Sequence, residues 1–321
     1  MRVAVLSGGR SSEHDVSLRS GVAVARGLRD AGHEVVAVTI ERDGRWLADG
    51  VAIGLTPAAG LLGVAAVFPA LHGPFGEDGS LQGLLEWLDV PYVGSDVLAS
   101  AICMDKLTLK RLFASRGIPQ VDFVAAGEHG WRRRCEAMGL PLWVKPSRLG
   151  SSVGISRVDD LAKLDAAVEL ARHYDPRVIV EAAASGREIE CSVLGNGAPE
   201  TSQPGEIVTA GGWYDFESKY GQGGMELRVP AAMDEAVTDR VRELAATTFE
   251  LAGCSGLGRC DFFLEPSGEV LVNEINTMPG FTETSVYAKL WEASGISYPD
   301  LCNRLIELAV ERHASARSHQ F

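Results

Sequence analysis

The sequence predicts an α/β protein with a parallel sheet in its N-terminal part and an α+β arrangement in its C-terminal part. Strand-like and helix-like segments alternate over residues 1–94, and the strand-like segments are largely apolar. Apolar strands joined by helices are typical of a parallel sheet that is covered on both faces. From Val178 to Val229 strand-like segments dominate, and a helix, a hairpin and a C-terminal helix follow.

Glycine punctuates the alternation in the N-terminal part. Gly8-Gly9 ends the first strand and Gly32 ends the first helix, as glycine often does at a helix C-terminus. We place the end of this domain near Gly94. The expected elements are strands at 3–6, 34–40, 64–71 and 92–93, and helices at about 16–30 and 81–88.

The rest of the chain contains one long helical pattern and several shorter elements. The long pattern covers residues 97–116 and stops at Gly117 and Pro119, which disfavour helix. The other expected elements are strands at 121–124, 142–144 and 155–158, helices at about 131–138, after Asp159 or Asp160, at 234–252 and after Pro299, and a frayed tail at 313–321.

The composition is that of an ordinary folded protein, and it limits the partners. The chain has 321 residues, 46% of them hydrophobic, with 30 Lys and Arg against 43 Asp and Glu and a formal net charge of −13. Such a charge argues against a binder of nucleic acid or of membrane surfaces, because both need a basic face. The six cysteines form no CxxC pair, which indicates reduced thiols and a cytoplasmic protein.

One segment has to be tested as a membrane span, because residues 50–73 contain no Asp, Glu, Lys or Arg. The segment is long enough to cross a bilayer. Pro57 and Pro69 interrupt it, however, and no basic cluster flanks it. We therefore expect a loop followed by a buried strand, and no membrane association.

The most informative pattern is a pair of strands around the turn Glu265-Pro266-Ser267-Gly268. The strands 258–263 and 270–276 would form a hairpin, and alternation places polar side chains of both on one face. If Leu264 pairs with Glu269, Asp261 lies opposite Val272 and diagonal to Glu274. Two carboxylates and an amide suit one or two Mg²⁺ ions, although a solvated hairpin face is the alternative. The candidate metal ligands are Asp261, Glu274 and Asn276.

A second pattern is the run from Lys145 to Gly154, in which a strand delivers a lysine into a Gly/Ser loop. The free N–H groups of such a loop can wrap phosphate oxygens. The loop is not a Walker A motif, because the lysine precedes the glycines. The same residues match G-x-S-x-G around Ser152, but that motif needs a helix directly after the serine, and 155–158 reads as a strand. A serine hydrolase is therefore disfavoured.

Lysine is scarce in this chain, which has only six, while arginine fills most basic positions. Lys106, Lys145 and Lys219 lie in unusual local contexts. A compact cation on a flexible stem suits phosphate neutralisation, so we interpret these three as phosphate ligands. Chance placement is the alternative.

Two loops near the N-terminus lie at strand ends, where α/β proteins commonly bind ligands. Residues 7–14 follow the first strand, and Glu13 there could bind a substrate ammonium or simply favour the helix dipole. Residues 72–79 end the third strand, and a lone His72 in such a place is usually structural.

Together these motifs resemble the D-alanine–D-alanine ligases of the ATP-grasp superfamily. The resemblance covers residues 3–309. Its motifs are Gly8-Gly9 with Ser12-Glu13 and 16–18, His72-Gly73 with 79–83, 104–106, 145–154, Tyr214-Asp215 with Lys219-Tyr220, and 258–280. Any one of them is weak, but six in order at family-like spacing are specific.

The resemblance implies an ATP-grasp fold with three domains, at 1–94, 95–180 and 181–321. It implies an ADP-forming ligase that phosphorylates the carboxylate of one D-alanine and lets the amine of a second D-alanine displace phosphate. The product would be the D-alanyl-D-alanine of peptidoglycan synthesis. The resemblance also implies a cytoplasmic homodimer that requires ATP and two Mg²⁺ ions, for which Mn²⁺ is a possible substitute.

The resemblance assigns the nucleotide and metal ligands. Lys106 and Lys145 would hold the α- and β-phosphates, and Lys219 the γ-phosphate. Two Mg²⁺ ions would be held by the three candidate metal ligands of the hairpin. The base and ribose would meet Glu181, the backbone of Ala182 and Ala184, and Glu188.

The resemblance also assigns the groups around the two amino acids. Glu13 would bind the first ammonium with His72 nearby, and Ser285 would anchor the second carboxylate. Arg259 and the N–H of Gly280 would stabilise the tetrahedral oxyanion. A hydrogen-bonded set would lock a loop over the site and exclude water; its members are Glu13, Ser151 and Tyr220.

The chain differs from many relatives at two places. Three alanines, 182–184, stand where relatives carry a lysine and a bulky residue, and Leu149 stands where many have a polar residue. The resemblance implies that Tyr220 favours amide over ester formation and is compatible with D-serine as second substrate. The alternatives are another carboxylate–amine ligase of the superfamily and a non-catalytic ATP-binding module. The second is disfavoured because Arg259 and all three metal-ligand positions are present.

Overall fold

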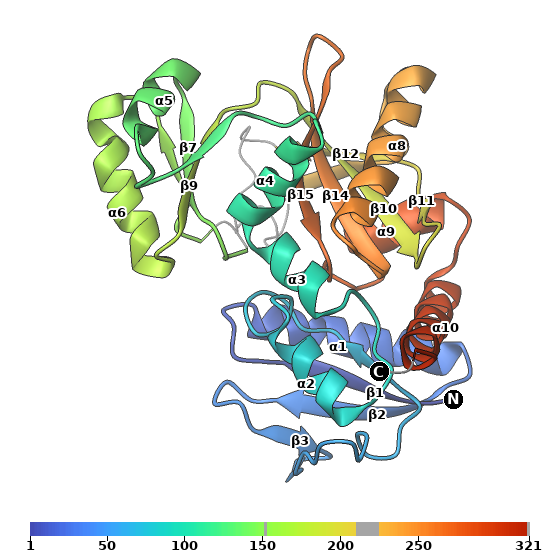
Figure 1. Cartoon of the computed structure of the whole chain (residues 1–321). Helices are drawn as coiled ribbons and strands as arrows, with labels where there is room; N and C mark the ends of the chain where they lie inside the picture. Colours follow the sequence, from blue (N-terminus) through green and yellow to red (C-terminus); the bar gives the residue numbers. More distant parts are fainter. Residues whose placement is uncertain (151–152, 210–224, 320–321) are drawn as a thin grey trace.

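The protein folds around three sheets, as its computed structural model shows for residues 1–150, 153–209 and 225–319. A five-stranded sheet forms the lower lobe of Figure 1, a four-stranded sheet the upper left lobe, and a six-stranded sheet the upper right part. No helix in these ranges is long and apolar enough to cross a bilayer.

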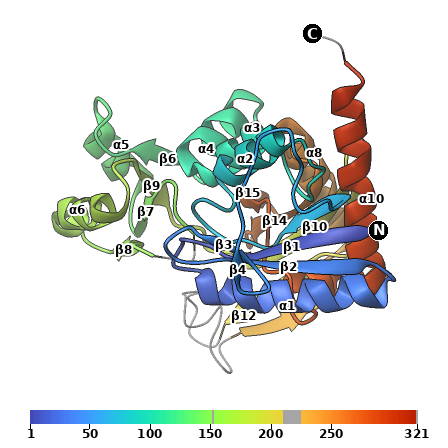
Figure 2. The ribbon, with the colours of Figure 1, turned by 90° about the horizontal axis from the view of Figure 1, so that it is seen from below.

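The five-stranded sheet has the order β4-β3-β2-β1-β5, with β1 parallel to both β2 and β5. Val3 and Val5 pack towards α1 and α10, while Ala4 and Leu6 pack towards α2, so both faces are covered. Figure 2 shows α1 and α2 on opposite sides of this sheet. The predicted parallel sheet is thus confirmed. Its elements are β1 Arg2–Gly8, α1 His14–Asp30, β2 Glu34–Ile40, β3 Trp46–Ala48, β4 Val51–Ala52, β5 Ala66–Pro69 and α2 Ser80–Leu88.

Two details of this lobe differ from the sequence prediction. The short strand expected at 92–93 is a single bridge between Tyr92 and Val67. The antiparallel β3–β4 hairpin was not expected, because each of its strands is only two or three residues long.

The predicted helix at 97–116 is two helices, α3 Val97–Met104 and α4 Lys106–Ser115. Asp105 breaks the pattern, since its backbone is extended (φ −90°, ψ 96°) and its side chain accepts a hydrogen bond from the N–H of Thr108. The same carboxylate accepts the Ser147 hydroxyl at 2.8 Å. Asp105 thus begins a new helix and places Lys106 in its first turn.

The four-stranded sheet is antiparallel, with the order β6-β9-β7-β8. Helices α5 and α6 pack on it around Trp131, Leu142 and Val180. Asp160, rather than Asp159, caps the short helix η1, because its side chain accepts from the N–H of Ala162. The elements are β6 Phe123–Ala125, α5 Trp131–Met138, β7 Leu142–Pro146, β8 Ser156–Val158, η1 Leu161–Lys163, α6 Leu164–Tyr174 and β9 Val178–Ala182.

The six-stranded sheet has the order β13-β12-β10-β14-β15, with β11 paired to β10. The core between this sheet and α8 contains Cys260, Phe262 and Phe249. The elements are β10 Arg187–Gly195, β11 Glu200–Thr201, β12 Gly205–Thr209, β13 Met225–Arg228, α8 Glu235–Leu251, β14 Gly256–Leu264, β15 Val270–Asn276, α9 Val286–Ala293 and α10 Tyr298–Arg317.

The expected β14–β15 hairpin is present, but its predicted register is wrong. Leu264 pairs with Val270, and Asp261 lies directly opposite Glu274. A bulge between Asp261 and Phe262 shifts the register by one residue. The shifted pairing at the turn and the bulge together bring the two carboxylates closer than the predicted diagonal placement would.

The frayed tail expected from His313 is helix as far as Arg317. Side chains of α10 fasten it to the end of α2: Arg317 Nε lies 2.8 Å from Asp89 Oδ1, and His313 Nε2 lies 3.1 Å from the same oxygen. Such long-range contacts leave no local signal in the sequence. Figure 2 shows this end of α10 standing out from the sheet.

Candidate active site

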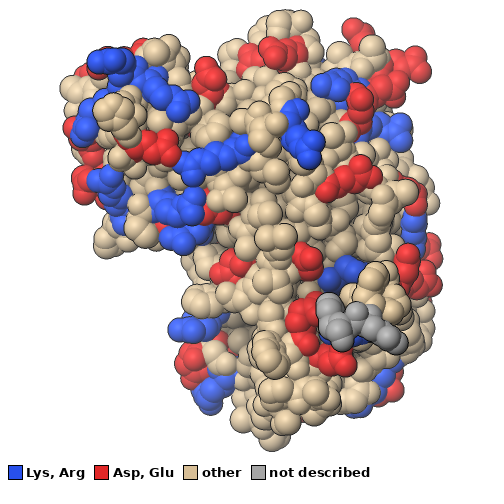
Figure 3. Space-filling model, in the orientation of Figure 1, with Lys and Arg blue, Asp and Glu red and all other residues tan. Residues whose placement is uncertain are grey.

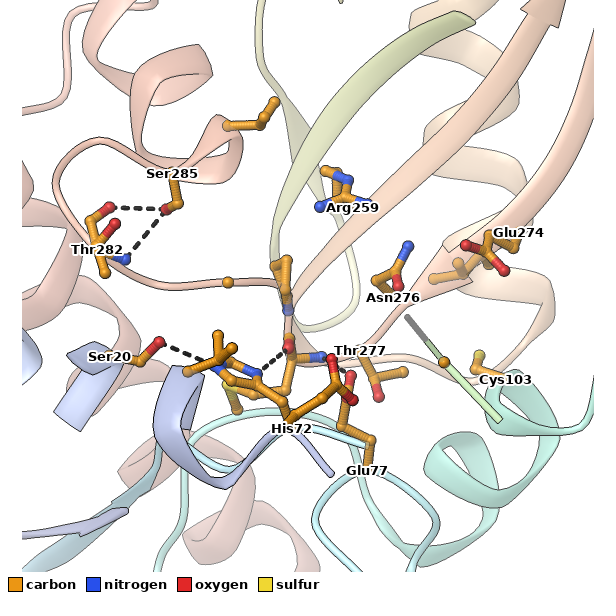
Figure 4. A pocket seen from close by; sticks show the side chains of 18 of the residues that line it. Ser20, His72, Glu77, Cys103, Arg259, Glu274, Asn276, Thr277, Thr282 and Ser285 are labelled. Atoms are coloured by element: carbon orange, nitrogen blue, oxygen red, sulfur yellow. Dashed lines mark hydrogen bonds between the residues drawn. The ribbon is translucent and has the colours of Figure 1, made fainter. Parts of the chain in front are cut away.

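Two adjacent cavities bring the candidate residues together. The first, of about 350 Å³, lies between the N-terminal lobe and the β14–β15 hairpin, and the second, of about 190 Å³, lies between the hairpin and the four-stranded sheet. Lys106, Gly150 and Glu274 line both cavities. Figure 4 shows the first cavity, with Arg259, Asn276 and Glu274 on the hairpin side and His72 and Glu77 on the other.

The hairpin carries an ion-pair cluster at the first cavity. Arg259 donates two hydrogen bonds to Asp261, from Nε at 2.7 Å and from Nη2 at 2.8 Å. Its Nε also lies 2.8 Å from Glu190 Oε2 on the neighbouring strand β10. Asn276 Nδ2 donates to Asp261 at 3.0 Å. The predicted common face is thus confirmed for Arg259, Asp261 and Asn276, but Val272, which alternation placed on the same face, is buried in the core because the bulge reverses its side.

Lys106 and Glu274 meet at the boundary between the two cavities. Lys106 Nζ lies 3.2 Å from Glu274 Oε2 and donates to the carbonyl of Leu149 at 3.2 Å. The contact is made by the backbone of Leu149, so it does not depend on the side chain at this position. Lys106 therefore reaches both the metal-type ligands of the hairpin and the loop after β7.

The charges around the second cavity bear on metal binding. Among its described lining residues, two are lysines and five are carboxylates. A site with this excess of negative charge can hold a polyphosphate only when further cations enter with it. Within the described ranges, no group of three or more His, Cys, Asp or Glu side chains has the geometry of a metal site. The oxygen-rich donor set nevertheless suits Mg²⁺; it consists of Asp261, Glu274 and Asn276.

The second cavity also contains a buried carboxylate between two lysines. Glu181 Oε1 lies 3.0 Å from Lys110 Nζ, and Oε2 lies 2.6 Å from Lys145 Nζ. Burial alone would raise the pKa of Glu181, but the two ammonium groups outweigh it and lower that pKa to about 2. Burial lowers the pKa of Lys110, whereas Glu181 and Glu274 overcome burial and raise that of Lys145.

His72 is buried and lines the first cavity, near the start of the loop between β5 and α2. Its Nδ1 lies 3.0 Å from the carbonyl of Met278, and its Nε2 lies 2.9 Å from Ser20 Oγ. Since a carbonyl only accepts, Nδ1 carries the proton and Nε2 accepts from Ser20. Burial lowers the pKa of His72 although Glu13 opposes this, so the ring is neutral.

Glu77 is a candidate that the sequence analysis did not single out. Its carboxyl accepts from the N–H of Gly73 at 2.6 Å and from the N–H of Met278 at 3.2 Å, so it links the N-terminal lobe to the segment after β15. Burial, and then the charge of Glu13, raise the pKa of Glu77 to about 8. The sequence analysis noted the loop 72–79, but the link from Glu77 to Met278 could not be seen in the sequence, because the two residues are far apart along the chain.

The remaining predicted residues are distributed over both cavities. Ser285 is the N-cap of α9, and its hydroxyl donates to Thr282 at 2.7 Å and accepts from the N–H of Thr282 at 3.1 Å (Figure 4). Glu13 and Gly280 line the first cavity, and Ala182, Ala184 and Glu188 line the second. Three predicted residues lie outside the described ranges: Ser151, Lys219 and Tyr220.

Two further charged residues were missed by the sequence analysis. Glu190 pairs with Arg259, and Lys110 pairs with Glu181. The scarcity of lysine was a usable signal for Lys110, whereas β10 gave no signal for Glu190.

Figure 3 shows several Lys and Arg side chains along the junction between the lobe of α5 and α6 and the rest of the molecule.

Comparisons with known proteins agree across the whole chain. A family model described as "D-ala D-ala ligase C-terminus" matches residues 112–307, and one described as "D-ala D-ala ligase N-terminus" matches 2–59 and 54–95. A D-alanine–D-alanine ligase of Deinococcus radiodurans is 45% identical over 97% of this chain and 98% of its own. The D-alanine–D-alanine ligase A of Escherichia coli K12 is 42% identical over 98% of this chain and 97% of its own.

Solved structures give the same result. The D-alanine–D-alanine ligase of Coxiella burnetii superposes with a TM-score of 0.89 at 37% identity, over 99% of this chain and 96% of its own. The VanG D-Ala:D-Ser ligase of Enterococcus faecalis superposes with a TM-score of 0.87 at 34% identity, over 96% of this chain and 99% of its own. With its three sheets and its two adjoining cavities, the chain belongs to the D-alanine–D-alanine ligase family and has the ATP-grasp fold.

Proposed function

We propose that the protein joins two D-alanines in an ATP-dependent reaction through a D-alanyl phosphate, giving D-alanyl-D-alanine for peptidoglycan. The observation that carries this proposal is that Lys106, Gly150 and Glu274 line both cavities. A nucleotide in the second cavity can therefore present its γ-phosphate to a carboxylate in the first. The two cavities divide the reaction into a phosphate donor side and an amino-acid side.

In the first step, a carboxylate oxygen of the first D-alanine attacks the γ-phosphorus, the bond to the β–γ bridging oxygen breaks, and ADP leaves. Glu13, buried on the first-cavity side, offers its charge to the ammonium of this D-alanine. His72 is neutral and adds no competing positive charge there. Lys106 and Lys145 face the phosphates, with Lys219 as the third lysine.

In the second step, the neutral amine of the second D-alanine attacks the carbonyl carbon of the acyl phosphate. The carbonyl oxygen becomes an oxyanion, the bond to phosphate oxygen then breaks, and the amine loses a proton. Arg259 and the N–H of Gly280 line the cavity where this oxyanion forms. Ser285 is placed to hold the carboxylate of the second D-alanine, and the set of Glu13, Ser151 and Tyr220 keeps water away.

We propose that Asp261, Glu274 and Asn276 hold two Mg²⁺ ions. Bound there, Mg²⁺ would neutralise phosphate charge at a cavity that is rich in carboxylates. The nucleotide base would meet Glu181 and the backbone of the alanine segment, and Glu188 the ribose. Small side chains at Ala182 and Ala184 leave the backbone contacts available.

We also propose a cytoplasmic homodimer, on family membership alone. Light scattering on the purified protein tests the oligomeric state, and a mass of one chain, 34.2 kDa, would contradict it.

The function is tested by phosphate release from ATP and Mg²⁺ with D-alanine, L-alanine, D-lactate or D-serine, together with mass spectrometry of the products. We expect release only with D-amino acids and a D-alanyl dipeptide with D-alanine. The similarity to a D-Ala:D-Ser ligase makes D-serine the informative second acceptor. Release without any dipeptide would contradict the proposal.

A further inference from the structure

The nucleotide roles proposed above leave one buried cation without a task. The Lys110 side chain is only 2% exposed and does not line either cavity. It extends from α4, which lies between the four-stranded sheet and the hairpin (Figure 1). A lysine is rarely buried to this extent unless a partner repays the desolvation of its charge.

Lys110 forms an ion pair with one carboxylate oxygen of Glu181, and Lys145 forms an ion pair with the other. The exposed fractions of the side chains are 2% for Lys110, 3% for Glu181 and 14% for Lys145. Only Lys145 of the two lysines reaches the cavity, so only Lys145 can turn from Glu181 to a bound phosphate. When it does, Glu181 would be a buried carboxylate without a counter-ion if Lys110 were not there.

We infer that Lys110 is a positioning residue for the nucleotide: its ammonium holds Glu181 Oε1, so that Lys145 can leave Glu181 for the phosphates while Glu181 stays ionised and faces the base. This inference rests on the proposed nucleotide site. The ring of Phe123 lies 5.9 Å from Lys110 Nζ. The backbone carbonyl of Lys110 accepts a hydrogen bond from the side chain of Gln120, which holds the backbone of α4 at this residue. Lys110 thus acts through Glu181 and does not touch the substrate.

The main test is calorimetric titration of ADP and Mg²⁺ into the purified protein, with steady-state kinetics beside it. We expect Lys110→Met to weaken ADP binding and to raise KM for ATP by about tenfold or more, while KM for D-alanine changes less than about twofold. Lys110→Arg keeps the charge and should recover most of the loss. Lys289→Met removes an exposed lysine of α9 and should bind ADP like the parent.

Several outcomes separate this inference from others. If the unaltered protein does not bind ADP, the proposed function itself fails. If the parent binds ADP and folded Lys110→Met binds it equally well, the positioning role is overturned. If Lys110→Met melts at a lower temperature but binds ADP with unchanged affinity, Lys110 has only a structural role, and the inference is likewise overturned.

A double variant keeps the test decisive if Lys110→Met does not fold. Lys110→Met with Glu181→Gln leaves neither of the two altered side chains charged. We expect its preference for ADP over GDP to fall at least about fivefold, because an amide can donate to the guanine oxygen that a carboxylate repels. An unchanged preference would show that Glu181 does not face the base and would overturn the inference.

Discussion

The two cavities differ in how their charges are balanced. In the first, the described lining residues include three cations and three carboxyl groups, one of which, Glu77, has a pKa raised to about 8. In the second, two lysines stand against five carboxylates. In the proposed function, the first cavity would receive zwitterions with little change in charge, whereas the second would accept a polyanion only together with cations. The comparison shows how one enzyme can bind neutral and highly charged substrates side by side.

The largest expected effect concerns Arg259, which belongs to the hairpin and lines the first cavity. Arg259→Met should lower kcat about 10²–10³-fold with a modest change in ATP affinity, because the guanidinium faces charge that develops in the transition state. Steady-state kinetics check this, with Arg240→Met, an exposed arginine of α8, as the matched control. A near-normal kcat would remove Arg259 from the oxyanion site.

The second prediction concerns the excess of carboxylates. Glu274→Gln should raise the Mg²⁺ concentration for half-maximal activity by about tenfold or more, because one anionic ligand is lost at the boundary of the cavities. The matched control is Glu269→Gln, an exposed glutamate in the same hairpin. Identical Mg²⁺ titrations for Glu274→Gln and the parent would mean that the excess charge does not recruit metal.

The smallest effect is a pH dependence on the amino-acid side. The pKa of Glu77 is about 8 in the folded protein, against an ordinary value of 4.5. Between these values the folded state keeps a proton that the unfolded state releases, so this group makes stability fall as pH rises from about 4.5 to 8. Glu77→Gln abolishes that contribution. As the pH rises across this window, the free energy of unfolding of the variant should therefore rise relative to that of the parent, by on the order of 1 kcal/mol per pH unit at most.

Urea unfolding of Glu77→Gln and of the parent at pH 5.5, 6.5 and 7.5 measures the difference. Glu292→Gln, an exposed glutamate of α9, should follow the parent at each pH. A constant difference between Glu77→Gln and the parent would mean that Glu77 is ionised in the folded protein.

Much of this could be predicted from sequence where the signal is local. The hairpin followed from its turn residues and alternating side chains, and the parallel sheet from apolar strands separated by helices. The common face of Arg259, Asp261 and Asn276 followed from the period of two residues along a strand. The metal-type donor set could thus be named in advance.

The errors have a common physical cause, which is that distant contacts decide the local geometry. Asp105 interrupts the predicted helix and bonds Ser147, 42 residues away. The carboxyl of half-buried Glu77 accepts a hydrogen bond from Met278, 201 residues away. The bulge in the hairpin leaves Asn273 without a partner and shifts the register, and no glycine at that position signals it. Lys110 is visible in the sequence, but its ion-pair partner Glu181 lies in β9, a strand that comes much later in the chain.

The central claim is that a carboxylate in the first cavity takes the phosphoryl group of a nucleotide in the second. It is tested most directly with D-alanine labelled with ¹⁸O in its carboxylate, followed by mass spectrometry of the inorganic phosphate. The account predicts one ¹⁸O atom in the phosphate for each dipeptide formed, because the carboxylate oxygen leaves with phosphorus. Unlabelled phosphate alongside labelled dipeptide would contradict it.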